Sequence, residues 1–204
     1  MMDFYEKKYL NEGYKFIAGC DEVGRGPIAG PLVCAAVVLN PDKRIEGLDD
    51  SKKLTEKKRE LLYDEIIAHA LAYAFVFIDE ESVDQSNVYQ ASKKGMIEAV
   101  NKLGVRVDFI LSDAMPLDTQ SVPYLSLIKG DQKSMSIAAA SIIAKVTRDR
   151  HMKTMAKKYP HYGFDKHKGY PTKAHIEALH KYGPCEIHRK SFHPVKSFFE
   201  YKLF

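Results

Sequence analysis

Short apolar segments bounded by glycine, proline or charged residues recur along the chain and predict the strands of a sheet. Residues 15–21 and 31–39 are rich in strand-forming side chains and are joined by a Gly/Pro segment, so we expect them to form an antiparallel pair. Similar runs at 71–78, 105–112 and 124–129 predict three more strands. The pattern therefore predicts five strands.

Apolar residues at helical spacing fill the intervals between these strands. Thr55 can cap a helix in which Leu61, Leu62 and Ile66 recur on one face. Further helices are expected at about 82–103, 133–158 and 173–181. Strands that alternate with helices in this way indicate an α/β fold.

Length and charge refine this picture. A chain of 204 residues with 45% hydrophobic content can bury one core, so we expect a single domain over 1–204, with about 150–204 forming a basic helical cap beside the sheet. The net charge of +4 hides an asymmetry, because acidic residues dominate before residue 129 and basic residues after it. This favours nucleic acid as a partner, although a basic, solvated helix face would give the same pattern.

Cysteine usage and hydropathy bear on the compartment. Cys20, Cys34 and Cys185 show no metal-binding spacing and cannot all pair within one chain, which favours a reducing environment, and the first two fall in core-like runs. The first residues lack the apolar centre of a signal peptide, and no window approaches the ~18 apolar residues of a membrane span. We therefore expect a cytoplasmic protein with no membrane association.

Four acidic residues lie at the ends of predicted elements rather than on helix faces. Asp21 and Glu22 end the first strand, Asp113 follows the fourth, and Asp131 precedes the long helix. Carboxylates so placed can converge on a hard divalent cation, although each one alone is equally typical of a helix cap or a turn. Neighbouring strand residues point to opposite faces, so the adjacent pair could serve one site only if the strand ends or bulges there.

The segment after the acidic pair, Gly24-Arg25-Gly26-Pro27, supplies backbone freedom beside a cation. A dinucleotide-binding loop is the alternative interpretation of these glycines. Their spacing departs from G-x-G-x-x-G, however, and the acidic pair precedes the glycines rather than following them. The arrangement instead favours chemistry on a phosphate.

Five separated segments together resemble bacterial ribonuclease HII. They are Cys-Asp-Glu-Val-Gly-Arg-Gly-Pro at 20–27, Asp-Ser-Lys-Lys-Leu at 50–54, the run from Lys-Gly-Asp-Gln to Thr-Arg-Asp at 129–149, Tyr-Gly-Phe-Asp-Lys-His-Lys-Gly-Tyr-Pro-Thr at 162–172, and His-Arg-Lys-Ser-Phe at 188–192. The resemblance spans about 15–195 in the family's order. It implies an RNase H-like fold: a central mixed five-stranded sheet, flanking helices and a C-terminal helical part that helps to hold the substrate.

The resemblance also implies an activity and a cofactor. The catalytic and metal-binding carboxylates become Asp21, Glu22, Asp113 and Asp131, which would bind Mg²⁺ or Mn²⁺, with two ions during catalysis. The implied substrates are RNA/DNA hybrids and duplex DNA containing a ribonucleotide. Hydrolysis on the 5′ side of the ribonucleotide would leave 3′-hydroxyl and 5′-phosphate ends.

Substrate contacts follow from the same resemblance. It assigns Gly24, Arg25 and Gly26 to the ribose 2′-hydroxyl and a phosphate, and Tyr170 to the RNA-to-DNA junction. Ser51 and Lys52 become phosphate contacts. Four further candidates for phosphate contact are Lys53, Lys145, Arg148 and Lys168.

One departure from the family and three open questions remain at this stage. Ala114 stands after the third carboxylate where the family usually has glycine. The short segment before the first strand favours type HII over the related type HIII, and a catalytically silent nucleic-acid-binding protein on the same fold is the competing hypothesis. We expect a monomer. The terminal Leu203-Phe204 loosely resembles sliding-clamp-binding peptides, with a folded apolar segment as the alternative.

Overall fold

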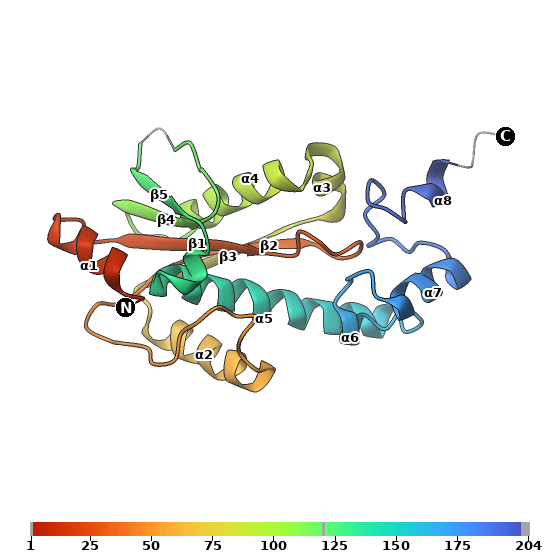
Figure 1. The fold of residues 1–204 in the computed structure, drawn as a ribbon, viewed down its shortest axis with the longest axis horizontal. Coiled ribbons are helices and arrows are strands. Elements are labelled where there is room, and N and C mark those ends of the chain that lie inside the picture. Colours follow the sequence, from red (N-terminus) through yellow and green to blue (C-terminus); the bar gives the residue numbers. More distant parts are fainter. Residues whose placement is uncertain (1, 120, 201–204) are drawn as a thin grey trace.

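A five-stranded mixed sheet organises the molecule in the computed structural model, which describes residues 2–119 and 121–200 (Figure 1). Its strands, in the order β3-β2-β1-β4-β5, are β3 Ala72–Ile78, β2 Leu32–Val38, β1 Ile17–Val23, β4 Phe109–Asp113 and β5 Tyr124–Leu127. β1 pairs antiparallel with β2 and β2 with β3, whereas β4 runs parallel to both β1 and β5. The predicted fold class and the antiparallel β1–β2 pair are confirmed.

Helices cover both faces of the sheet. They are α1 Phe4–Asn11, α2 Glu56–His69, α3 Glu80–Ser86, α4 Val88–Asn101, α5 Met135–Lys158, α6 Phe164–His167, α7 Lys173–Tyr182 and α8 Ser197–Glu200, with a 3₁₀ turn η1 at Gly130–Gln132. Figure 1 shows α3 and α4 on one face of the sheet and α2 and α5 on the other. No helix in the described ranges is both long and apolar enough to cross a bilayer.

Strand β2 shows why the sheet is sandwiched. Its alternate residues Cys34 and Ala36 pack into the core beneath α4, whereas Val33 and Ala35 pack into the core beneath α2 and α5. All residues of the strand are buried, as its unbroken apolar run predicts. Cys34 therefore has the core position expected from the sequence, as does Cys20 in β1.

Three elements differ from the sequence-based expectation. The helix predicted at 82–103 is two helices, because Asn87 adopts φ 71° and its side chain caps the second by accepting from two backbone N–H groups. Helix α1 was not expected. The C-terminal helices α7 and α8 lie beyond one end of the sheet and not beside it, and α6 packs against the last part of α5 (Figure 1).

Gly19 sets how closely β1 approaches the start of α5. A Cβ atom at this position would lie 2.1 Å from the carbonyl carbon of Ser136 and 2.3 Å from the backbone nitrogen of Ile137. Gly19→Ala is therefore expected to lower the free energy of unfolding by about 3 kcal/mol or more, because backbone rather than a flexible side chain must move. Urea unfolding measures this, with Gly26→Ala, where the added carbon would meet only Tyr170 Cε1 at 3.5 Å, as the control for loss of glycine. Equal losses in both variants would contradict the close approach.

Candidate active site

Asp21 and Asp113 lie side by side at the centre of the sheet. Cys20 pairs with Ser112 in the parallel β1–β4 ladder, so the two aspartates are the next residues along neighbouring strands and share a face. Asp21 is buried, and burial followed by the charges of Glu22 and Asp113 raises its pKa well above the usual value. The structure thus brings these two predicted ligands together.

The side chain of Glu22 lies on the face of the sheet opposite to that of Asp21 and Asp113. The strand neither ends nor bulges at the acidic pair but continues to Val23, with Asp21 opposite Ala35 and Glu22 opposite Cys34. The expectation that the strand would end at this pair is therefore wrong. The Glu22 carboxylate is nevertheless coupled to the others, because burial, together with the charge of Asp113, raises its pKa to about 7 although Arg25 lowers it.

The turn before α5 positions the third and fourth carboxylates. Asp113 Oδ1 accepts a hydrogen bond from the Gly130 backbone N–H at 2.6 Å. A Cβ on Gly130 would lie 3.2 Å from that oxygen and 2.6 Å from Ile137 Cδ1, so a side chain would crowd this contact. Asp131 follows directly, and burial and the charges of Asp113 and Asp50 raise its pKa to about 6.

Lys52 supplies positive charge to this cluster. Burial alone would lower its pKa, but the carboxylates raise it overall, in the order Asp21, Asp50, Asp131 and Asp113. The ammonium group therefore interacts with three of the four predicted carboxylates. This supports the prediction that Lys52 belongs to the site.

Asp50 was not assigned a role from the sequence. It is buried, and its carboxylate accepts from the Lys52 backbone N–H at 2.9 Å and from Gln132 Nε2 at 3.4 Å. It therefore ties the segment that carries Lys52 to the turn that carries Asp131. The only signal in the sequence was its position directly before Ser51-Lys52.

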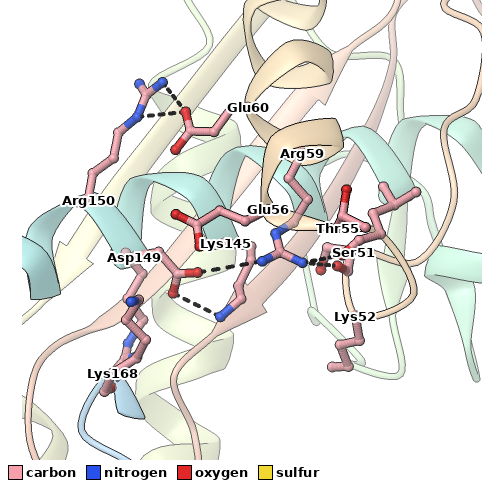
Figure 2. A network of polar contacts seen from close by, with 12 residues as sticks. Ser51, Lys52, Thr55, Glu56, Arg59, Glu60, Lys145, Asp149, Arg150 and Lys168 are labelled. Carbon is pink, nitrogen blue, oxygen red and sulfur yellow. Dashed lines mark hydrogen bonds and ion pairs between the residues drawn. The ribbon is translucent and has the colours of Figure 1, made fainter. Parts of the chain in front are cut away.

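Arg59 of α2 holds the same segment from the other side (Figure 2). It donates to the carbonyls of Ser51, at 2.9 Å, and Leu54, at 2.5 Å, and lies 4.0 Å from Asp149, which accepts from Lys145 at 2.8 Å. Ser51 is only 2% exposed, which contradicts the prediction that it lies open to a phosphate. Ser51 therefore helps to position the segment that carries Lys52, and Lys145 is paired with the carboxylate of Asp149.

The Gly24-Arg25-Gly26 loop follows β1 and meets Tyr170. Gly24 has φ +109°, a conformation that favours glycine. A Cβ on Gly26 would lie 3.5 Å from Tyr170 Cε1, so the loop backbone lies beside this ring. Tyr170 is 42% exposed, and the Arg25 side chain is also exposed, 3.4 Å from Glu22 Oε1. Arg25, Gly26 and Tyr170 are therefore accessible at this loop, whereas Gly24 is buried behind it.

Arg148 does not contribute to that surface. It is fully buried and donates to three backbone carbonyls, those of Pro31 at 2.8 Å, Lys168 at 2.9 Å and Ala29 at 3.2 Å. The prediction that it contacts a phosphate is therefore wrong. Its guanidinium takes the place of water for carbonyl groups that precede β2 or follow α6 and would otherwise be unsatisfied.

Ala114, the departure from the family pattern, carries backbone strain beside Asp113. Its φ is 47°, in the left-handed region where glycine is preferred. Ala114→Gly is expected to raise the free energy of unfolding by about 0.5–1 kcal/mol, because the relief of strain exceeds the added entropy of the unfolded chain. Urea unfolding should show a higher midpoint with an unchanged slope, and a lower midpoint would contradict the strain.

The raised carboxylate pKa values predict a pH dependence for the metal-free protein. Glu22 changes from an ordinary 4.5 to about 7 and Asp131 from 3.8 to about 6, so the folded state binds these protons more tightly than the unfolded state. Their contribution to stability is complete below the ordinary values and is lost as the pH rises through the folded ones. We expect unfolding free energy to fall by roughly 2 kcal/mol between pH 5 and 8 in chelator.

Glu22→Gln provides the matched test of this pH dependence. The variant should lose about two thirds of the slope, because Glu22 has the larger shift and Asp131 still titrates. Urea unfolding at a series of pH values measures it. A slope equal to that of the parent protein would show that Glu22 keeps its ordinary pKa.

The donor chemistry of the cluster fits a divalent cation. Glu22 Oε2 is buried with no hydrogen-bond partner among the described residues, and the surrounding groups are carboxylates whose mutual repulsion raises their pKa values. Oxygen donors of this kind are what Mg²⁺ and Mn²⁺ prefer. The side chains of residues 2–119 and 121–200 do not, as placed, form a ready-made group of three or more metal ligands.

Comparison with known proteins places this site in a class. A family model for ribonuclease HII matches residues 18–195. The ribonuclease HII of Bacillus cytotoxicus is 53% identical over 202 residues, which cover 99% of this chain and 78% of that protein. The B. subtilis ribonuclease HII is 53% identical over 199 residues, 97% of this chain and 77% of that one.

A solved structure agrees with these sequence matches. Ribonuclease H2 from Pyrococcus horikoshii OT3 superposes with a TM-score of 0.78 at 29% identity, covering 91% of this chain and 98% of that one. The sheet and its carboxylates therefore define an endonuclease of the ribonuclease H class. Within this class, the chain belongs to the ribonuclease HII family, which cleaves the RNA of RNA/DNA hybrids.

Proposed function

We propose that this chain is a divalent-metal-dependent nuclease that incises duplex DNA on the 5′ side of an embedded ribonucleotide and also hydrolyses the RNA strand of hybrids. The products would carry 3′-hydroxyl and 5′-phosphate ends. The observation that carries the proposal is the gathering of Asp21, Asp113 and Asp131 around Lys52, next to an accessible loop and tyrosine. The protein would act as a cytoplasmic monomer, with residues 1–204 forming one catalytic domain.

Asp21, Glu22, Asp113 and Asp131 would hold the metal. Mg²⁺ or Mn²⁺, with two ions present, would supply an activated water and stabilisation of the leaving oxygen. Gly130 keeps one Asp113 oxygen oriented through its N–H, and Asp50 keeps Lys52 beside the cluster. These contacts fix the carboxylates before substrate arrives, which lowers the reorganisation needed for reaction.

The loop after β1 and Tyr170 would select the sugar. The absence of a side chain at Gly26 lets the backbone approach a ribose, where a 2′-hydroxyl distinguishes RNA from DNA. Arg25, Lys52 and Lys53 are exposed and would contact phosphates, with Arg25 exchanging its contact to Glu22 and Lys53 its contact to Asp49. The basic C-terminal part, about 150–204, would add further contacts to the duplex.

Cleavage of a labelled RNA/DNA hybrid in Mg²⁺, in Mn²⁺ and in chelator tests the metal requirement. The proposal predicts cutting of the RNA strand with either ion and none in chelator. Undiminished cutting in chelator would contradict it.

A contact between the C-terminus and a sliding clamp is a second proposal. Residues 201–204, which include Leu203 and Phe204, lie outside the described residues, so the proposal stands on the sequence. It is supported by a related structure, the ribonuclease HII of Archaeoglobus fulgidus solved in complex with PCNA. That protein superposes with a TM-score of 0.73 at 26% identity, covering 86% of this chain and 94% of that one. Deletion of residues 200–204 should abolish clamp binding in a pull-down, and unchanged binding would contradict the proposal.

A further inference from the structure

Arg189 is a buried residue that holds the Gly24-Arg25-Gly26 loop by its carbonyl groups. Its Nη2 donates to Gly24 O at 2.7 Å and to Gly30 O at 2.8 Å, its Nη1 to Arg25 O at 3.2 Å, and its Nε to Gly30 O at 3.1 Å. The side chain is fully buried, so none of these donors faces solvent. Its planar fork of donors matches this set of acceptors in a way that a lysine could not.

Backbone contacts join the same part of the chain to the segment that carries Tyr170. The Arg189 N–H donates to Ile28 O at 2.9 Å, and the Ile28 N–H donates to Gly169 O at 3.0 Å. A Cβ on Gly169 would lie 2.1 Å from Ala29 O, so the two segments are in direct contact. Residues 28–29, which follow the loop, therefore lie between residue 189 on one side and residue 169 on the other.

His188 is linked to the backbone of Tyr170 through a second histidine, His175. Tyr170 O lies 2.9 Å from His175 Nδ1, and His175 Nε2 lies 3.1 Å from His188 Nε2. His188 Nδ1 in turn accepts from the Cys185 N–H at 2.9 Å. Both histidines are buried, with exposures of 0% and 2%.

The partners fix where each proton lies along this chain. A carbonyl only accepts, so His175 Nδ1 carries the proton toward Tyr170, and His175 Nε2 is an acceptor. His188 must then donate from Nε2, which leaves its Nδ1 free to accept from Cys185, as the structure shows. Burial lowers the pKa of His175 and of His188 to about 4, so both rings are neutral at neutral pH and the assignment holds.

We propose that the adjacent residues His188 and Arg189, with His175, are positioning residues that hold the Gly24-Arg25-Gly26 loop and Tyr170 in register with each other. Arg189 holds the loop, and His188 holds Tyr170 through His175. The relative position of the loop and Tyr170 sets how well a ribose and the following deoxyribose are recognised together. These residues therefore act on substrate choice and not on the carboxylates. The inference rests on the proposed recognition of an RNA-to-DNA junction.

Two substitutions of His175 separate the ends of the histidine chain. Asn places its side-chain amide where the imidazole Nδ1 stands, so His175→Asn keeps a donor to Tyr170 O. Gln reaches the position of Nε2, so His175→Gln keeps the contact with His188 and loses the one to Tyr170. Tyr170 O also accepts from the Thr172 N–H at 2.8 Å, so neither change leaves this carbonyl unpaired.

The test compares kcat/KM on duplex DNA with one ribonucleotide and on a continuous RNA/DNA hybrid. His175→Gln, which loses the contact to Tyr170, and His175→Asn, which loses the contact to His188, should each lower the ratio of the two roughly tenfold, the size expected for a misplacement below 1 Å. His188→Leu should behave like His175→Gln, and His188→Gln, which keeps a donor and an acceptor, should rescue it. The matched control is His161→Gln. His161 is exposed and lies outside the chain formed by His175 and His188, so its substitution should leave the ratio unchanged.

A purely structural role would give a different result. Equal losses on both substrates, or a ratio that stays at the parent value in His175→Gln and His188→Leu while both variants remain folded by near-UV circular dichroism, would overturn the inference. A parent protein that does not cleave the single-ribonucleotide duplex, or a Tyr170→Ala variant with an unchanged ratio, would instead overturn the proposed junction recognition. The two failures are therefore distinguishable.

Discussion

Replacing Asp113 with asparagine is expected to reduce cleavage by roughly three orders of magnitude while hybrid binding stays within about threefold of the parent protein. Asparagine keeps the oxygen that accepts from Gly130 N–H, so the turn before α5 should survive the change. It removes one negative charge from the coupled cluster and thus one predicted metal ligand. The basic and exposed groups that contact phosphates are untouched, so affinity depends little on this residue.

Single-turnover cleavage and a fluorescence binding titration in the presence of Ca²⁺ measure the two quantities for Asp113→Asn. Asp118→Asn is the matched control, because Asp118 lies in the loop that follows the same strand and its side chain is exposed. That control should cleave at the parent rate. Parallel losses of binding and cleavage in Asp113→Asn would contradict a role confined to the metal site.

Replacing Tyr170 with alanine is expected to lower cleavage of a single embedded ribonucleotide about tenfold more than cleavage of a continuous hybrid. The ring lies beside the Gly26 backbone and is open to solvent, so its loss removes a stacking surface without emptying the core. Stacking of this kind is worth about 1–3 kcal/mol, of which 1.4 kcal/mol corresponds to a factor of ten. A continuous hybrid offers several registers and depends less on one junction.

Tyr170→Phe and Tyr182→Ala complete this comparison. The phenylalanine variant keeps the ring and should retain most of the discrimination if packing dominates. Tyr182 is a similarly exposed tyrosine on α7 and its loss should leave both substrates unaffected. An equal effect of Tyr170→Ala on both substrates would remove Tyr170 from the junction.

The sheet could be predicted because its strands have simple patterns. The unbroken apolar runs of β2 and β3 are typical of strands, and both predicted ranges agree with the structure. The long helix α5 was placed to within two residues, since Ser134 caps it and small residues allow it to pack on β1. By contrast, α1 is short, and it is stabilised by tertiary contacts, namely its packing on the sheet and the hydrogen bonds that Glu6 accepts from Ser134 and Ser136.

The helix break at Asn87 was missed because helical spacing continues on both sides of it. Asparagine tolerates a positive φ, and its side chain then caps the following helix. The spacing of apolar residues does not reveal this break.

Of the four carboxylates that the sequence singled out, the structure gathers Asp21, Asp113 and Asp131 around Lys52, whereas the residues that hold their surroundings could not be predicted. Arg148 and Arg189 look like surface cations in the sequence, but all their partners except Lys168 O are carbonyls from segments more than a hundred residues away. Asp50 and Arg59 are hidden in the same way, because each acts through a backbone contact to the segment of Lys52. Such roles depend on tertiary contacts, which local sequence patterns do not contain.

Mapping the incision in a DNA duplex that contains one ribonucleotide tests the central claim most directly. The duplex is labelled at either end and incubated with Mg²⁺ or Mn²⁺, and the products are sized against chemical ladders that identify their end groups. We predict one nick, on the 5′ side of the ribonucleotide, with a 3′-hydroxyl and a 5′-phosphate. Cutting of long hybrids with no nick in this duplex, or a nick on the 3′ side, would contradict the assignment of the loop and Tyr170 to the ribose and the junction.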